Sequence, residues 1–201
     1  YRLSNQIGDY VVRGRYCEVI LNGAYQGIYQ LTESIKRDSN RVDIAKLTSN
    51  DLSGDELTGG YIVKIDWIGG PSWPSNYLPD QTAPYNNVIY FQAIEPQPSR
   101  IEPAQQNYIQ LYVDSFETAL ASQSYADTSI GWRRVANEAS FIDHHILIEL
   151  SKNIDGYWLS TYFSKDKDSK GGKLTMGLVW DFNGAWHGAD YCNAQTTVDW
   201  Q

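Results

Sequence analysis

Residues 147–188 read LIELSKNIDGYWLSTYFSKDKDSKGGKLTMGLVWDFNGAWHG, and this stretch decides the fold. Apolar residues at helical spacing end at Leu150, and Asn153-Ile154-Asp155-Gly156 then breaks the helix. Two β-rich segments follow at residues 157–163 and 174–180, joined by a polar turn that contains glycine. The pattern predicts a helix, a loop and an antiparallel hairpin.

Two aspartates flank this hairpin, with Asp155 before its first strand and Asp181 after its second. A hairpin returns the chain beside its start, so we expect the two carboxylates to lie close together. Neighbouring carboxylates resist joint ionisation unless a cation lies between them, and Mg²⁺ is the usual cation for an all-oxygen site. An ordinary hairpin whose aspartates cap turns gives the same spacing, so the motif alone leaves both interpretations open.

Three segments resemble the hallmarks of the CotH kinase family, a group of atypical kinases. They are Leu21-Asn22-Gly23-x-Tyr25-x-Gly27-x-Tyr29-x-Leu31-x-Glu33, then Asn153-x-Asp155-Gly156-Tyr157, then Lys173-Leu174 with Trp180-Asp181-Phe182-Asn183. The segments follow the family's order along nearly the whole chain, which is more specific than any one motif.

The resemblance implies an α+β, atypical protein-kinase-like fold with two lobes. Residues 1–98 would form a β-rich lobe that covers the nucleotide and lacks its N-terminal part. Residues 99–201 would form a helical lobe with the catalytic hairpin, the catalytic loop and the metal-binding turn. The implied reaction is Mg²⁺-dependent transfer of the ATP γ-phosphate to Ser or Thr of a surface or coat protein.

The resemblance also assigns roles to the residues around the hairpin. Asp155 would act as catalytic base and Asp181 as a Mg²⁺ ligand. Protein kinases carry an asparagine five residues after the catalytic Asp, and this chain has Ser160 there. A hydroxyl is a weaker ligand than an amide oxygen, so Asn153 or Asn183 would substitute for it, or only one metal ion would be well held.

A phosphate-binding lysine is expected on the strand predicted at residues 59–66. The resemblance assigns this role to Lys64, with Glu33 as its ion-pair partner and Lys36 as the second choice. A lysine at the end of an apolar strand more often extends to solvent. The charged turn that contains Lys36 has the same two interpretations, phosphate contact or solvated loop.

The remaining sequence predicts short elements around these motifs. Asn22-Gly23 is typical of a two-residue hairpin turn because both positions favour positive φ. The other expected elements are a strand at 88–94, helices at 102–121 and 137–153, and an irregular loop at 67–87. His144 and His145 are adjacent on the second helix and cannot both face one metal ion, so packing roles are expected for them.

Composition excludes some partners. The 201 residues carry a net charge of −8, which disfavours nucleic acid or an anionic membrane as main partner. No apolar run is long enough for a transmembrane span. The resemblance implies an extracellular or cell-surface bacterial protein, of which this chain, starting at Tyr1, would be a part. Cys17 and Cys192 fit one disulfide or two thiols.

Two other functions compete with the kinase. A catalytically weak or dead kinase-like module could bind surface glycans or proteins through its 7 Trp and 15 Tyr residues. A glycosidase could use two carboxylates separated by about 5–9.5 Å. Magnesium-dependent binding of ATP separates the first function from the other two.

Overall fold

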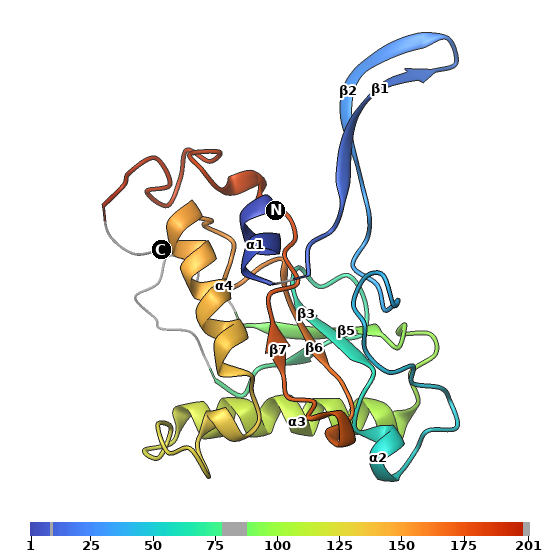
Figure 1. Cartoon of the computed structure of the whole chain (residues 1–201), viewed down its shortest axis with the longest axis vertical. Coiled ribbons are helices and arrows are strands. Elements are labelled where there is room, and N and C mark those ends of the chain that lie inside the picture. Colours follow the sequence, from blue (N-terminus) through green and yellow to red (C-terminus); the bar gives the residue numbers. More distant parts are fainter. Residues whose placement is uncertain (9, 78–87, 199–201) are drawn as a thin grey trace.

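The computed structural model describes residues 1–8, 10–77 and 88–198, and its centre is a five-stranded sheet (Figure 1). The strand order is β4-β5-β3-β6-β7, and all neighbouring strands are antiparallel. The helices are α1 (Arg2–Ile7), α2 (Gly54–Leu57), α3 (Pro103–Ala121) and α4 (Glu138–Ser151). The strands are β1 (Gly14–Leu21), β2 (Ala24–Thr32), β3 (Tyr61–Ile65), β4 (Trp73–Pro74), β5 (Tyr90–Glu95), β6 (Thr161–Lys165) and β7 (Thr175–Met176). The expected α+β class is confirmed.

The sheet takes strands from both sides of the lobe boundary predicted at residues 98 and 99. Strand β3 pairs with β5 on one edge and with β6 on the other, from Tyr61 opposite Lys165 to Ile65 opposite Thr161. Because β3 is buried along most of its length, its backbone needs hydrogen-bond partners on both edges. The strands therefore form one layer that the predicted boundary does not divide.

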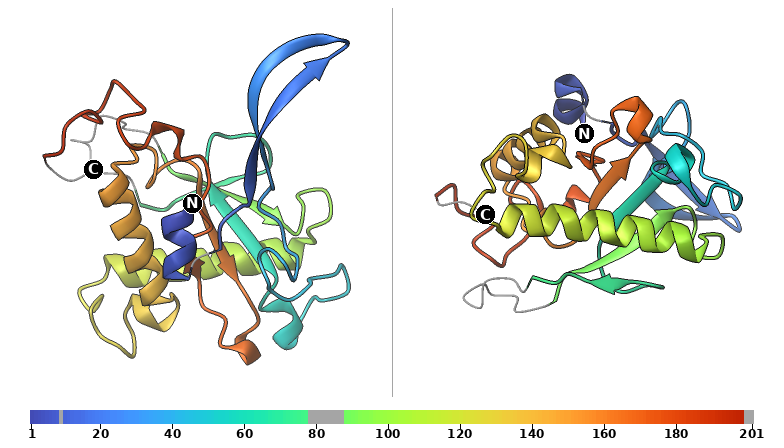
Figure 2. Two further views of the ribbon diagram at one scale, coloured as in Figure 1. Left: turned by 45° about the horizontal axis from the view of Figure 1, so that its top comes forward. Right: turned by 90° about the horizontal axis from the view of Figure 1, so that it is seen from below.

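The two faces of β3 contact different parts of the chain. Tyr61, Val63 and Ile65 pack in one core with Ile109 and Val113 of α3, which runs across that face of the sheet (Figure 2). Ile62 and its neighbours pack in a second core on the opposite face. Side chains alternate along a strand, so Lys64 lies on the same face as Ile62, away from α3.

Both helices expected in the second half of the chain are present. Helix α3 begins at Pro103, close to the predicted start at residue 102, and Glu102 and Gln105 form a capping box there. Helix α4 follows Asn137 and ends where Lys152 adopts a left-handed conformation with φ of 48°. The left-handed conformation of Lys152 changes the direction of the chain, which continues as the loop that carries Asp155.

The hairpin predicted after α4 is present, with shorter strands than expected. Residues 157–160 form turns, because Ser160 has a left-handed φ of 49° that interrupts the extended chain before β6. On the return, only Thr175–Met176 pairs with β6, since Leu174 bonds instead to the backbone of Val135 and Asn137. The irregular loop predicted at 67–87 contains β4, and its residues 78–87 lie outside the described residues.

Strands β1 and β2 form an arm, residues 14–32, that extends away from the sheet in Figures 1 and 2. Its turn has φ of 51° at Asn22 and 80° at Gly23, which confirms the expected Asn-Gly turn. Seven large apolar side chains of the arm are more than half exposed: Tyr16, Ile20, Leu21, Tyr25, Ile28, Tyr29 and Leu31. Cys17 lies on this arm and is not linked to Cys192. Within the described ranges, no helix combines the length and apolar character that a membrane span needs.

Candidate active site

The loop that carries Asp155 is fixed by its neighbour Gly156. The Gly156 carbonyl oxygen accepts hydrogen bonds from His144 Nε2–H at 3.2 Å and Thr161 Oγ1–H at 3.0 Å. A carbonyl only accepts, so His144 carries its proton on Nε2. A Cβ atom at position 156 would lie 2.2 Å from Ile148 Cδ1. Glycine is thus required for the loop to pack on α4, and His144 has the packing role expected for it.

Replacing Gly156 by Ala is expected to destabilise the protein by about 1–3 kcal/mol, because the new methyl group overpacks the site against Ile148. Urea unfolding measures this change. Gly70→Ala is the matched control, since a Cβ atom there meets nothing within 4 Å, and its effect is expected to stay within about 0.5 kcal/mol. Adding Ile148→Val to Gly156→Ala removes the clashing Cδ1 atom and is expected to restore part of the loss. Equal stability of the two alanine variants would contradict this account.

Asp181 is positioned by the strand segment that precedes it. Val179 forms a parallel bridge with Val11, and Trp180 packs against the second core. Asp181 then adopts a left-handed conformation with φ of 56°, which starts the 3₁₀ turn Phe182–Gly184. Its Oδ2 accepts a hydrogen bond from Ser160 Oγ at 3.4 Å.

The two aspartates of the hairpin motif lie close enough to interact. Burial raises the pKa of the Asp155 carboxyl, and the negative charge of Asp181 raises it further. The hairpin geometry therefore places Asp155 and Ser160 each near Asp181, and the proximity of the two aspartates is the one that the hairpin pattern predicted. Asn183 lies two residues beyond Asp181 in the exposed turn, and Asn153 is buried beneath the loop with its Oδ1 unpaired among the described residues.

Lys64 lies on β3, the strand that pairs with β6 next to the aspartate hairpin. It lies opposite Tyr162 of β6, and its Nζ pairs with Asp66 Oδ2 at 2.8 Å. Burial, followed by the charges of Asp66 and Asp181, raises the pKa of Tyr162 to about 12. The Lys64–Asp66 pair and Asp181 thus lie around one tyrosine, on the face of the sheet away from α3.

The expected ion pair between Lys64 and Glu33 does not form. Glu33 instead accepts a hydrogen bond from Arg13 Nη2 at 2.5 Å and lies 3.8 Å from Arg41 Nε. Hydrogen bonds from Arg13 lower the pKa of Glu33 to about 2. Glu33 follows the end of β2 at the base of the arm, where Arg13 precedes β1, so strand pairing brings these two residues together. The ion-pair partner of Lys64 is instead Asp66, two residues after it in sequence.

Lys36, the second choice for phosphate contact, lines another cavity. That cavity also contains Arg37, Lys46 and Arg100, and neither aspartate of the hairpin lines it. A smaller cavity of about 400 Å³ lies beside Asp66 and is lined by Trp67 and Trp158. The two indole rings meet edge to face, with centroids 5.7 Å apart. Such a cavity can accept a planar ring by stacking.

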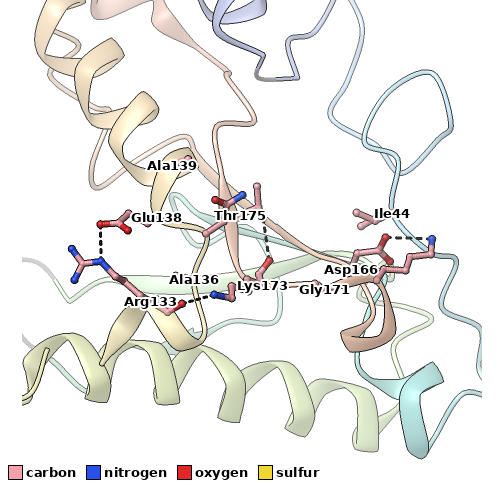
Figure 3. Close-up of a pocket in the computed structure, with 12 residues that line it drawn as sticks. Ile44, Arg133, Ala136, Glu138, Ala139, Asp166, Gly171, Lys173 and Thr175 are labelled. Atoms are coloured by element: carbon pink, nitrogen blue, oxygen red, sulfur yellow. Dashed lines mark hydrogen bonds and ion pairs between the residues drawn. The ribbon is translucent and has the colours of Figure 1, made fainter. Parts of the chain in front are cut away.

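A further polar pocket lies at the start of α4 (Figure 3). Arg133 Nε pairs there with Glu138 Oε1 at 2.6 Å, and Lys173 Nζ donates to the Arg133 carbonyl oxygen at 2.6 Å. Lys173, which belongs to one of the family-like segments, therefore ties the hairpin to the 3₁₀ turn Trp132–Arg134 that precedes α4. Neither Asp155 nor Asp181 lines this pocket.

Three residues near the site were missed from the sequence: Asp66, Tyr162 and Thr161. Asp66 had a usable signal, because residues two apart on a strand share a face and Asp66 follows Lys64 at that spacing. Tyr162 had none, since its place opposite Lys64 depends on the pairing of β3 with β6. Thr161 contacts the Gly156 carbonyl oxygen within the loop, and no motif in the sequence indicated that contact. No cluster of three or more His, Cys, Asp or Glu side chains is placed to hold a metal ion in the part of the chain that the structure describes.

The fold and this site define an α+β protein whose hairpin brings two aspartates together beside a strand lysine. A family model described as CotH kinase protein matches residues 1–201. The chain therefore belongs to the CotH kinase family. No curated protein and no solved structure matches it.

Proposed function

We propose that the chain transfers the γ-phosphate of ATP to a Ser or Thr hydroxyl of a surface or coat protein, with Mg²⁺ as cofactor. The observation that carries the proposal is the meeting of Asp155 and Asp181 at one end of the hairpin, with Ser160 within hydrogen-bonding distance of Asp181. Membership of the CotH kinase family supports a kinase-like activity.

The donor atoms at this site fit magnesium. The side chains of Asp181, Ser160 and Asp155 offer oxygen atoms only. Mg²⁺ is usually held by one or two carboxylates together with water and phosphate oxygens. Burial, followed by the charge of Asp181, raises the pKa of Asp155, and a cation between the two carboxylates would relieve their repulsion. When bound, the ion would neutralise the charge of the phosphate groups.

The chain's own residues would act on the acceptor hydroxyl and on the nucleotide. Asp155 would accept the proton of the Ser or Thr hydroxyl as its oxygen forms a bond to the γ-phosphorus. The bond from that phosphorus to the β,γ-bridging oxygen breaks, and ADP leaves with the electron pair. Lys64 would contact phosphate as a point charge, held in place by Asp66. Trp67 and Trp158 would stack on the base.

Calorimetric titration of ATP with and without Mg²⁺ tests the proposal. We expect Asp181→Asn to weaken Mg²⁺-ATP binding at least about tenfold, because it removes an anionic ligand while keeping the side-chain shape. Asp43→Asn, at an exposed carboxylate away from the hairpin, is the control and is expected to bind like the parent. Magnesium dependence that survives Asp181→Asn unchanged would rule out the metal role of Asp181.

A kinase-like module with weak or no catalysis is the second candidate. The observation that favours it is Ser160, which stands where protein kinases place a metal-binding asparagine. Under this function, Trp67, exposed beside Trp158, would contact a glycan ring. Binding of a glycan without any Mg²⁺-ATP binding would favour the module over the kinase. Family membership gives no support to the glycosidase hypothesis.

A further inference from the structure

A polar cavity of about 770 Å³ lies at the end of β3 that is remote from the aspartates. Four cationic side chains line it, from three separate segments of the chain: Lys36, Arg37, Lys46 and Arg100. Two carboxylates, Glu95 and Glu102, also line it. Glu102 is engaged in the capping box of α3, where its carboxylate accepts a backbone N–H. The cavity therefore has an excess of positive charge, in a chain whose net charge is −8.

None of the four cations takes part in an ion pair among the residues that the structure describes. In the same part of the chain, seven lysine or arginine contacts to carboxylates are formed elsewhere. Like charges gathered in one concave site repel each other and lower the stability of the fold unless an anion is bound. The cluster is thus suited to a ligand that carries several negative charges.

The walls of the cavity are held in place before any ligand binds. The side chain of Gln105 is buried and donates to the carbonyl oxygens of Thr48 at 2.6 Å and Asp51 at 3.2 Å. Gly60 has a φ of 97°, and a Cβ atom there would lie 2.7 Å from the Ala45 carbonyl oxygen. Asp166 accepts a hydrogen bond from Ala45 N at 2.8 Å. These contacts fix the segment that carries Lys46.

The segment that carries the other two N-terminal cations is also constrained. Arg37 forms a parallel bridge with Val42, and Val42 N donates to the Lys36 carbonyl oxygen at 3.2 Å. Val42 itself is buried in the second core. Arg100 lies in the turn before α3, where its backbone N–H donates to Gln97 O at 2.7 Å. The backbone positions of all four cations are therefore preorganised.

This cavity is separate from the aspartate site. Gly60 lines it, whereas Asp66 lies near Tyr162, on which the charge of Asp181 also acts, and the strand between Gly60 and Asp66 spans roughly 20 Å at about 3.3 Å per residue. Lys36 is therefore placed to contact an anion in this cavity, at the other end of β3 from Lys64.

We propose that the cavity binds a small oligophosphate anion, independently of the aspartate site and of its proposed function. Phosphate groups fit best because the arginine fork matches two phosphate oxygens, while lysines contribute point charges from other directions. The cavity volume accommodates several linked phosphate groups, so more than two cations can be neutralised by one ligand.

Calorimetric titration with sodium tripolyphosphate in EDTA, at constant ionic strength, tests this inference. We expect Arg37→Gln combined with Lys46→Gln to weaken binding at least tenfold. The matched control is Arg2→Gln combined with Arg15→Gln, which removes the same charge outside the cavity and is expected to change binding less than twofold. Arg100→Gln is a second variant, with an expected loss of a few-fold, and thermal melts report whether each variant is folded.

Three results would overturn the inference. The first is that the parent protein does not bind tripolyphosphate. The second is that the cavity and control variants lose equal affinity, which would indicate a general charge effect. Binding could also depend on Mg²⁺ and be lost in Asp181→Asn, which would assign the anion to the aspartate site. Retained tripolyphosphate binding in Asp181→Asn supports the cavity, whether or not that variant binds ATP.

Discussion

Replacing Asp155 by Asn is expected to reduce phosphotransfer by about 10²–10⁴-fold, while ATP affinity stays within a few-fold of the parent. Asp155 lies in the loop fixed by Gly156, and under the proposed function it would accept the proton of an incoming hydroxyl. A general base contributes to the rate and little to the affinity for the ground-state nucleotide. Transfer to Ser-rich peptides, with ATP binding measured in parallel, tests both parts. Phosphate transfer by the Asp155→Asn variant at the parent rate would rule out this mechanism.

The same substitution is expected to stabilise the fold at neutral pH. The pKa of Asp155 is raised in the folded protein, so the folded state binds its proton more tightly than the unfolded state does. The ionised carboxylate therefore destabilises the fold above the raised pKa, and the effect disappears below the ordinary pKa of Asp. Thermal melts in EDTA should show Asp155→Asn melting above the parent at pH 7, with the two converging as the pH falls below about 4. A lower melting temperature for the variant at pH 7 would mean that Asp155 has a structural role.

Replacing Lys165 by Met is expected to lower the free energy of unfolding by about 3 kcal/mol, because it leaves buried acceptors without a donor. The Lys165 side chain is 0% exposed, and its three N–H donors are surrounded by four acceptors within hydrogen-bonding distance: the Asp168 carboxylate and the carbonyl oxygens of Thr58, Asp166 and Gly172. It also lies 4.4 Å from the ring centroid of Tyr112. Methionine keeps the volume and the ring contact but supplies no hydrogen-bond donor. The expected fall in melting temperature is about 6–12 °C for a chain of this size.

Lys170→Met is the matched control for Lys165→Met. Lys170 is in the same hairpin turn, its side chain is 55% exposed, and its only ion pair within the described residues is with Asp166 at 3.4 Å. An exposed pair of this kind contributes about 0–1 kcal/mol. Equal losses for the two variants would show that the burial of Lys165 does not matter to the stability of the hairpin.

Local pattern was enough to predict most of the elements. Asn22-Gly23 specified the turn of the arm because its two positive φ angles are costly for other residues, and both were found. The apolar pattern that predicted a helix over residues 102–121 agrees with α3 at Pro103–Ala121, and the polar turn at residues 165–172 placed the hairpin. The proximity of Asp155 and Asp181 followed from that hairpin alone.

Partners between distant segments were harder to predict. Glu33 pairs with Arg13, and not with Lys64, because the antiparallel pairing of β1 with β2 brings the two ends of the arm together. The pairing of β3 with β6 joins the two halves that the sequence divided at residues 98 and 99. An ion pair depends on distances of a few ångströms, and no local pattern encodes those distances.

The sequence by itself determined the family, the hairpin and the residues at its two ends, because each of these depends on neighbours along the chain. The tertiary structure alone decided which face of the sheet receives Lys64, how tightly Gly156 packs on Ile148, and that four unpaired cations within the described residues surround one cavity. These features arise where segments far apart in sequence pack together. The physical reason is that burial and Coulomb interactions depend on position in space, which a chain acquires only when it folds.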